Sequence, residues 1–364
     1  MRWRLFFAAW VLIPFTAFAS PVELIPILET LVKLNTKAAQ SPEAPLTRIA
    51  SGSTLKLGSS GQRVAQLNAR LAELGFAAQG DRFDADTDAA VRNYQHAAGI
   101  VEDGLVDEHT RFNLNLSDRE KIALLRAQFD EMERLFAQND DRRFVVVNLP
   151  AFSLHAFDKG KKMLESRVVI GSQARPTPIM KTSLTGIVLN PPWAPPPTIL
   201  AKDIFRSGEI DPRTVARLGL KLVDGHGQSA PLDSVTTQSD LATGDYRLVQ
   251  PPGEKNALGQ LKFDLDDPFG VYLHDTNHRD LFSKGFRALS SGCVRVDHFR
   301  ELAAWMLNEE TSDIDRELRD RRTRRLDVEK MPVFTVYWLA EAVGDKVVFY
   351  RDIYDRYGVA RAKK

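Results

Sequence analysis

The chain has 364 residues, of which 43% are hydrophobic and 27% are charged, a composition that excludes a disordered protein and allows at least one sizeable core. Its 49 basic and 48 acidic residues give a formal net charge of +1, so the global charge offers no reason to expect nucleic acid or an anionic membrane as a partner. The length favours two or three domains, and we expect a monomer.

The first 19 residues have the pattern of a secretory signal peptide. A basic start at residues 1–4 precedes an apolar run at residues 5–18, and Ala17 and Ala19 give the small-x-small pattern of a cleavage site. An uncleaved membrane anchor is the alternative, but the run is shorter than the roughly 20 apolar residues that a span needs, and Pro14 interrupts it. We therefore expect cleavage, export to the periplasm and no stable membrane span.

Export sharpens the meaning of the single cysteine, Cys293. A secreted chain that is stabilised by disulfides carries an even set of cysteines, whereas this thiol has no partner in the chain. The thiol is therefore either buried and inert or retained for its reactivity, and composition alone leaves both interpretations open.

Residues 20–52 predict a short helix followed by a linker. The apolar stretch from Leu24 to Leu34 favours the helix, and the Pro-, Ser- and Ala-rich residues 41–45 favour the linker. The sequence indicates no function for this segment.

Residues 53–116 predict a bundle of three short helices. The apolar residues of the first helix form one stripe at helical spacing, which Gly75 terminates. Asp86 and Thr87 are expected to cap the second helix, and the third is expected to begin near Asp107.

This segment is similar to the peptidoglycan-binding domain found beside many wall hydrolases and transpeptidases. The matching residues are Leu57, Gly58, Gly61, Val64, Leu67, Leu71, Gly75, Phe76, Phe83, Asp84, Thr87, Ala90, Val91, Tyr94, Gln95, Gly99, Ile100, Asp103, Gly104 and Asp107. Asn68 departs from the pattern, since the family usually has Gln there. The apolar positions would form the core of the bundle in any case, and the resemblance implies a docking module for glycan or stem peptides.

A long amphipathic helix at residues 117–141 is expected to connect the bundle to the next domain, because Ser117 and Glu120 form a capping box in front of a helical apolar stripe. From residue 142 to residue 350 the hydrophobic period becomes alternating, which predicts a β-rich domain. The expected strands lie at residues 144–149, 152–156, 166–170, 185–189, 260–263, 271–273, 332–340 and 346–350.

Three further segments complete the expected organisation. Residues 191–244 predict an insertion with one or two short helices, large enough to form a lid. A helix is expected at residues 298–308, and the charged run at 316–325 is interpreted as a solvated helix face. Residues 351–364 are a C-terminal tail. The predicted fold class is therefore α+β, with a small three-helix bundle followed by a β-rich domain that carries a helical lid.

Residues 271–296 contain every part that thiol acyl transfer needs. A thiol is mostly protonated at neutral pH, so a base must stand beside Cys293, and His274 is the candidate because it follows a short apolar strand. Gly292 removes side-chain bulk where a carbonyl substrate must approach, and a helix is expected soon afterwards.

Two kinds of positive group surround the candidate nucleophile. The backbone amides of Ser291, Gly292 and Cys293 are expected to face a developing oxyanion, an effect often worth roughly 3–4 kcal/mol per donor. Arg295 adds a fixed charge, which is expected to lower the pKa of the thiol or to hold a substrate carboxylate.

These residues resemble the L,D-transpeptidase catalytic domain, also called YkuD-like, of the large type that carries a lid and a peptidoglycan-binding domain. The similar residues are Thr177, Pro178, Asn190, Pro191, Pro192, Trp193, Pro197, Ile199, Leu200, Asn256, Ala257, Leu258, Gly259, Lys262, Phe263, Tyr272, Leu273, His274, Asp275, Thr276, Ser290, Ser291, Gly292, Cys293 and Arg295. Ser291 departs from the family, which often has a second His before Gly-Cys.

The resemblance implies a role for each matching site residue. Cys293 would be the nucleophile and His274 the general acid and base, oriented by the backbone carbonyl of Asp275. Trp193 and Tyr272 would contact the bound stem peptide, together with Arg295. No other residue class competes, because His278 and His298 are expected to face solvent and no cluster has zinc-ligand or phosphate-loop spacing. We expect no metal and no cofactor.

The implied reaction joins peptidoglycan stem peptides. Cys293 would attack the diaminopimelate carbonyl of a donor tetrapeptide, release D-Ala, and pass the acyl group to an acceptor amine to give a 3-3 cross-link. Water as the acceptor would make an L,D-carboxypeptidase, and an amino acid or a lipoprotein lysine would make an exchange or anchoring enzyme. Joining through the first residue of the stem and a non-catalytic wall-binding scaffold also stay open.

Overall fold

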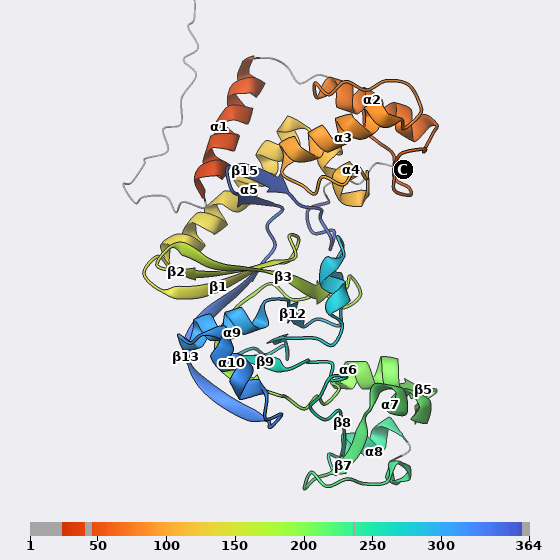
Figure 1. The fold of residues 1–364 in the computed structure, drawn as a ribbon, viewed down its shortest axis with the longest axis vertical. Coiled ribbons are helices and arrows are strands. Elements are labelled where there is room, and N and C mark those ends of the chain that lie inside the picture. The colour runs from red at the N-terminus through yellow and green to blue at the C-terminus, as the bar shows by residue number, and fades with distance from the viewer. Residues whose placement is uncertain (1–23, 41–45, 236, 359–364) are drawn as a thin grey trace, which may run out of the picture.

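The computed structural model describes residues 24–40, 46–235 and 237–358 (Figure 1). The predicted signal peptide lies outside these residues. Within the described part of the chain, no helix combines the length and hydropathy that crossing a bilayer requires. The fold class is α+β, as predicted, with a helical N-terminal region followed by a β-rich domain.

The N-terminal region consists of one packed bundle and two longer helices. The helices are α1 (Ile25–Gln40), α2 (Gln62–Glu73), α3 (Ala85–Ala98), α4 (Glu108–Asn115) and α5 (Asp118–Ala137). Helices α2, α3 and α4 surround one apolar core, which contains Val64, Leu67, Leu71, Val91 and Leu114.

The N-terminal caps of these helices follow the sequence with one exception. Asp107 caps α4, and Ser117 forms the expected capping box with Glu120 on α5. The cap of α3 is Asp84 rather than the expected Asp86 and Thr87. The carboxylate of Asp84 accepts a hydrogen bond from the Thr87 amide at 2.9 Å, because the backbone is still extended at Asp84 and turns helical one residue later.

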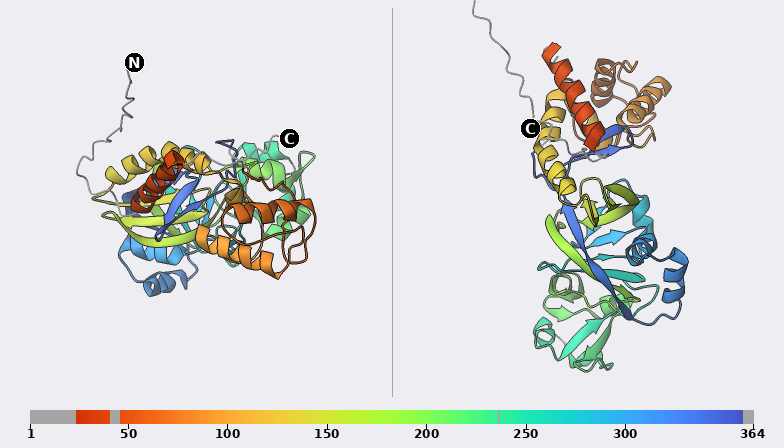
Figure 2. Two further views of the ribbon diagram at one scale, coloured as in Figure 1. Left: turned by 90° about the horizontal axis from the view of Figure 1, so that it is seen from above. Right: turned by 90° about the vertical axis from the view of Figure 1, so that its left-hand side faces the viewer.

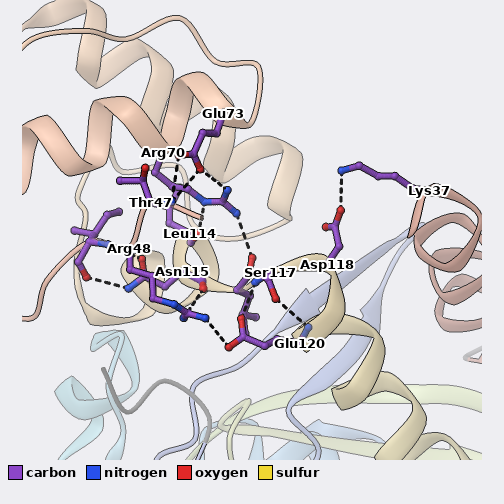
Figure 3. Close-up of polar contacts among 12 residues, drawn as sticks. Lys37, Thr47, Arg48, Arg70, Glu73, Leu114, Asn115, Ser117, Asp118 and Glu120 are labelled. Carbon is purple, nitrogen blue, oxygen red and sulfur yellow. Dashed lines mark hydrogen bonds and ion pairs between the residues drawn. The ribbon is translucent and has the colours of Figure 1, made fainter. Parts of the chain in front are cut away.

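Polar contacts fix the bundle to α5 (Figure 3). Arg70 of α2 is only 7% exposed and donates to the Leu114 carbonyl at 2.7 Å, so a buried guanidinium satisfies a backbone oxygen at the end of α4. Arg48 pairs with Glu120 at 2.8 Å, and the same carboxylate closes the capping box with Ser117. The bundle, the segment before it and α5 therefore form one continuous unit.

The β-rich domain is a closed barrel. Strand β3 pairs with β2 along its first half and with β12 along its second half, so the sheet returns to its own edge and leaves β11 as an extra strand beside β3. The strands are β1 (Arg143–Asn148), β2 (Ser153–Asp158), β3 (Lys161–Gly171), β4 (Met180–Leu189), β9 (Leu261–Leu265), β10 (Leu273–His274), β11 (Ala288–Ser290), β12 (Val294–Val296) and β13 (Arg324–Val336).

Two helices, α9 (Phe299–Leu307) and α10 (Thr311–Leu318), pack against the barrel core. The charged run at residues 316–325 was expected to form one helix face, and this expectation is wrong. The run contains the end of α10, a turn and the start of β13. Arg321 in that turn has φ 56°, a left-handed conformation that interrupts the helix.

The lid is the insertion between β4 and β9, residues 191–260. It has its own apolar core, formed by Trp193, Ile204, Val215, Leu220, Leu222, Val235, Leu248 and Leu258. Its elements are α6 (Pro197–Ile199), the π-helical turn η2 (Leu200–Ile204), β5 (Phe205–Arg206), β6 (Glu209–Ile210), α7 (Pro212–Leu218), β7 (Lys221–Asp224), the 3₁₀ turn η3 (Leu232–Ser234), α8 (Gln238–Ala242) and β8 (Tyr246–Val249). Because β8 pairs with β7, the insertion extends beyond the expected boundary near residue 244.

The lid and the helical bundle lie at opposite ends of the barrel (Figures 1 and 2). The bundle is joined to the barrel by α5 and by the hairpin of β14 (Ala340–Val343) and β15 (Lys346–Phe349). Val348 of this hairpin enters the core of the bundle, and Asn113 of α4 donates to the Phe349 carbonyl at 2.9 Å. The β14–β15 hairpin therefore packs against the bundle.

Candidate active site

The predicted catalytic residues lie on two neighbouring parallel strands. In the register of β10 with β12, Leu273 faces Val294 and His274 faces Arg295, and the Val294 amide donates to the Tyr272 carbonyl at 3.1 Å. Leu273 and Val294 are buried in the barrel core. Because side chains alternate along a strand, the four residues Tyr272, His274, Cys293 and Arg295 share the opposite face.

Cys293 lies at the entry of strand β12. Strand β12 (Val294–Val296) follows it directly, and the helix that the sequence predicts at residues 298–308 is found as α9 (Phe299–Leu307). The side chain is partly exposed. Burial raises the pKa of the thiol above its usual value, and hydrogen bonds from Tyr272 and the charge of Arg295 act in the other direction without cancelling it. The thiol is therefore protonated at neutral pH.

His274 is only 5% exposed and points its Nδ1 at the Asp275 carbonyl, 2.5 Å away. A carbonyl oxygen only accepts, so Nδ1 carries the proton and Nε2 keeps its lone pair. Burial, and next the charge of Arg295, lower the pKa of the imidazole to about 3. The site therefore holds a neutral imidazole with one free basic nitrogen on the same face as a neutral thiol.

The loop before Cys293 is fixed by hydrogen bonds at each residue. Ser290 Oγ donates to the Cys293 carbonyl at 2.6 Å and accepts from the Gly292 amide at 3.1 Å. Thr177 Oγ1 donates to the Gly292 carbonyl at 2.7 Å. The Gly292 amide thus already donates to a group of the chain. Of the three amides that the sequence suggested for an oxyanion site, it is therefore not available to an oxyanion.

Gly292 is constrained by its backbone conformation. Its φ is 125°, a conformation that side chains disfavour, whereas a Cβ built there would meet nothing closer than the Arg175 carbonyl at 4.0 Å. The constraint within the chain is therefore conformational, and the expected clearance for a carbonyl substrate stays a prediction.

Two cations flank His274 from the neighbouring strands. Arg295 faces it from β12, and its Nε is buried without a hydrogen-bond partner among the described residues. Lys262 faces it from β9, with Nζ 4.8 Å from the centre of the Tyr272 ring and 2.7 Å from Asp264. Sequence reasoning did not assign a role to Lys262, although its alternation with the buried Phe263 already placed it on the outer face.

Trp193 is an anchor of the lid. It is 8% exposed, lies in the lid core and forms an isolated bridge with Gln250, in which the Trp193 amide donates at 2.9 Å. Tyr272 packs against this core, and it lies close enough to Cys293 for each group to affect the pKa of the other. The lid core therefore reaches the nucleophile through Tyr272, and Trp193 presents little free surface to a substrate.

The two other histidines that the sequence analysis weighed lie where it expects them, since His278 and His298 are exposed. Among the described residues, no group of three His, Cys, Asp or Glu side chains is placed to hold a metal ion.

The family model of the L,D-transpeptidase catalytic domain, named YkuD, matches residues 142–348, which is more than half of the chain. The chain belongs to this L,D-transpeptidase family. A second model, described as "Putative peptidoglycan binding domain", matches residues 60–111, which covers the three-helix bundle.

Individual relatives of this L,D-transpeptidase family member have low sequence identity to it. A curated Haemophilus influenzae protein named "Putative L,D-transpeptidase" is 33% identical over 226 residues, which is 61% of this chain, and the chain spans only 46% of that protein. A solved L,D-transpeptidase from Xylanimonas cellulosilytica aligns with 15% identity and a TM-score of 0.26, covering 81% of this chain and 100% of the other. L,D-transpeptidase 1 of Mycobacterium tuberculosis aligns with 16% identity and a TM-score of 0.23, covering 54% and 62%.

Proposed function

We propose that this protein is a peptidoglycan L,D-transpeptidase that forms 3-3 cross-links through a thioester on Cys293. The observation that carries the proposal is the neutral His274, whose Nδ1 is held by the Asp275 carbonyl and which shares one sheet face with the thiol. A neutral imidazole with a free Nε2 is suited to take a thiol proton during attack on a carbonyl.

The residues divide the proposed reaction between them. As Cys293 Sγ bonds to the diaminopimelate carbonyl carbon, His274 takes the thiol proton, and it returns this proton to the D-Ala amine when the carbon–nitrogen bond breaks. An acceptor amine then attacks the thioester, loses a proton to His274 and restores the thiol. The amides of Ser291 and Cys293 are assigned to the oxyanion, because the Gly292 amide already bonds Ser290.

Arg295 is assigned to the substrate. Arg295 has an unpartnered buried Nε beside His274, and a stem carboxylate would satisfy it. Tyr272 is assigned to positioning of the thiol as well as to substrate contact, since it hydrogen bonds Cys293. We assign Trp193 to holding the lid over Tyr272.

The domain division and the location follow from the same proposal. We assign residues 53–116 to docking on peptidoglycan, residues 117–141 to the connecting helix and residues 142–350, with the lid, to catalysis. The substrate is then the cell wall, and we assign the protein to the periplasm, an assignment that the N-terminal pattern of residues 1–19 supports.

Transfer to an amine is favoured over hydrolysis by the burial of the base. His274 is 5% exposed and the lid core contacts Tyr272 beside it, so bulk water has little access to the thioester. Hydrolysis to a shortened stem, and transfer to an amino acid or a lipoprotein lysine, use the same thioester and differ only in the acceptor.

The proposal is tested by incubating purified protein with tetrapeptide muropeptides and analysing the products by mass spectrometry. We expect D-Ala release and 3-3 linked dimers from the unmodified chain, and no product from Cys293→Ala. The variant should still sediment with purified peptidoglycan, because the bundle and the lid lie at opposite ends of the barrel (Figure 1). Unchanged dimers with Cys293→Ala would contradict the proposal.

A further inference from the structure

An arginine outside the expected site contacts the loop that carries the nucleophile. Arg175 lies in the short segment after β3, where its amide donates to the Ser172 carbonyl at 3.0 Å, and the Ser172 amide donates to the Ser290 carbonyl at 2.9 Å. A Cβ on Gly171 would lie only 2.2 Å from the Arg175 carbonyl, so the segment packs tightly against the end of β3. Arg175 therefore stands on a rigid support beside residues 290–293.

The guanidinium of Arg175 links this loop to the lid. Nη1 donates to Ser291 Oγ at 2.8 Å and to Asp203 Oδ2 at 3.0 Å, and Nη2 donates to Asp203 Oδ1 at 3.3 Å. Asp203 belongs to the π-helical turn η2 of the lid. The contact with Asp203 is a two-point guanidinium–carboxylate pair, and the serine two residues before Cys293 fixes the orientation of the guanidinium.

The pair with Asp203 is a weak one that another carboxylate can replace. Asp203 is 47% exposed and Arg175 is 21% exposed in their side chains, and solvent weakens an ion pair whose partners are in contact with it. Ser291 does not compete, because a neutral hydroxyl offers Nη1 a single acceptor and leaves Nη2 to the carboxylate. Asp203 of the lid thus occupies a carboxylate-binding site on Arg175, and its pair with Arg175 is weak.

We propose that Arg175 binds a carboxylate of the incoming stem peptide, and that Asp203 occupies this site until the substrate displaces it. The inference rests on the proposed function, because it takes the substrate to be a peptidoglycan stem. It also gives Ser291 a role, because the Ser291 hydroxyl orients Arg175. The family often has His at this position. Opening of the lid and binding of the stem would then be coupled through one guanidinium.

Two carboxylates of a donor tetrapeptide have the required chemistry, namely the terminal carboxylate of D-Ala and the free carboxylate of diaminopimelate. The site lies at the boundary of the lid and the loop before Cys293, whereas Arg295 lies on the strand after Cys293. A stem with carboxylates on both sides of its reacting carbonyl would engage both arginines.

The inference is tested by calorimetric binding of a tetrapeptide stem to the Cys293→Ala protein, in which no turnover interferes. Adding Arg175→Lys keeps the charge but removes the planar two-point geometry, and we expect the dissociation constant to rise about tenfold. Adding Asp203→Asn removes the competing carboxylate, and we expect the dissociation constant to fall. Arg206→Ala is the matched control, since Arg206 is a lid arginine that pairs with Asp211 instead, and binding should not change.

Stems amidated at the D-Ala carboxylate or at the diaminopimelate carboxylate identify the group that binds. The amide at the correct position should bind weakly to the Cys293→Ala protein and should lose nothing further with Arg175→Lys. The inference would be overturned if Arg175→Lys weakened the binding of the unmodified stem and of both amidated stems equally. It would also be overturned if Asp203→Asn did not bind the stem more tightly. Unchanged protease sensitivity of residues 191–260 in all variants shows that the lid is intact. Failure of the proposed function would appear elsewhere, as missing D-Ala release by the unmodified chain.

Discussion

The barrel and the lid meet at the candidate active site but differ in construction. The barrel is a closed sheet around one continuous core that extends to α5, α9 and α10. The lid is a single insertion with a core of eight buried side chains, held together by three short helices, two short turns and two two-stranded ribbons. Among the described residues, its contacts with the site include the packing of its core on Tyr272, the pair of Asp203 with Arg175, and the hydrogen bond from the Gln260 amide to Asp275.

This difference separates two tasks. The groups that need exact placement for the proposed chemistry, His274, Cys293 and Arg295, stand on strands of the barrel. The groups that cover them belong to the lid, which we expect to open for substrate entry. Rigidity and access are therefore assigned to different parts of one domain, and variants in each part should have different consequences.

The largest expected effect is on the barrel side, with His274→Gln. Loss of the base should lower the rate of D-Ala release by roughly 10²- to 10⁴-fold, because Gln cannot take the thiol proton. The imidazole is already neutral in the folded protein, so the substitution removes no charge. Rates with the tetrapeptide stem and thermal unfolding of the same samples check this. A rate within fivefold of the unmodified chain would remove His274 from the mechanism.

Core truncations should distinguish the two parts directly. Phe263 is fully buried in the barrel, and Phe263→Ala should lower the free energy of unfolding by about 3–5 kcal/mol. Leu222 is equally buried in the lid core, and Leu222→Ala should leave the main unfolding transition in place while making residues 191–260 sensitive to protease and raising the share of hydrolysed product. A single cooperative loss of both parts in Leu222→Ala would show that the lid is not a separate unit.

The smallest effect concerns pH. Burial raises the pKa of Cys293 and lowers that of His274 to about 3, so the two groups should not form a thiolate–imidazolium pair at pH 7. The rate of Cys293 alkylation by iodoacetamide should therefore rise continuously from pH 7 to pH 9, and His274→Gln should show the same profile. A plateau reached below pH 7 that His274→Gln abolishes would reveal the ion pair instead.

The sequence predicted the parts of the site that depend on local pattern. A lone cysteine after Gly and a histidine after an apolar strand pointed to the pair that the structure places on one face, and the Asp275 carbonyl lies where the family resemblance suggested. The capping box at Ser117 and the three-helix bundle were likewise predicted from the spacing of residues close in the sequence.

The sequence could not predict what depends on register and long-range closure. Lys262 becomes a neighbour of His274 only because β9 pairs with β10, and Arg175 reaches Ser291 only because the end of β3 lies beside residues 290–293. The strand after Cys293 was not predicted, because three residues carry too little hydrophobic period to indicate a strand. The π-helical turn that carries Asp203 has no sequence signature of its own.

The most direct test of the central claim is the intact mass of the protein during turnover. Acid quenching within seconds of mixing with a tetrapeptide stem should trap a species heavier by the acyl tripeptide, and peptide mapping should place the added mass on Cys293. A carbapenem should give a stable adduct at the same residue. Release of D-Ala without any adduct on Cys293, or with the adduct on another residue, would contradict the account.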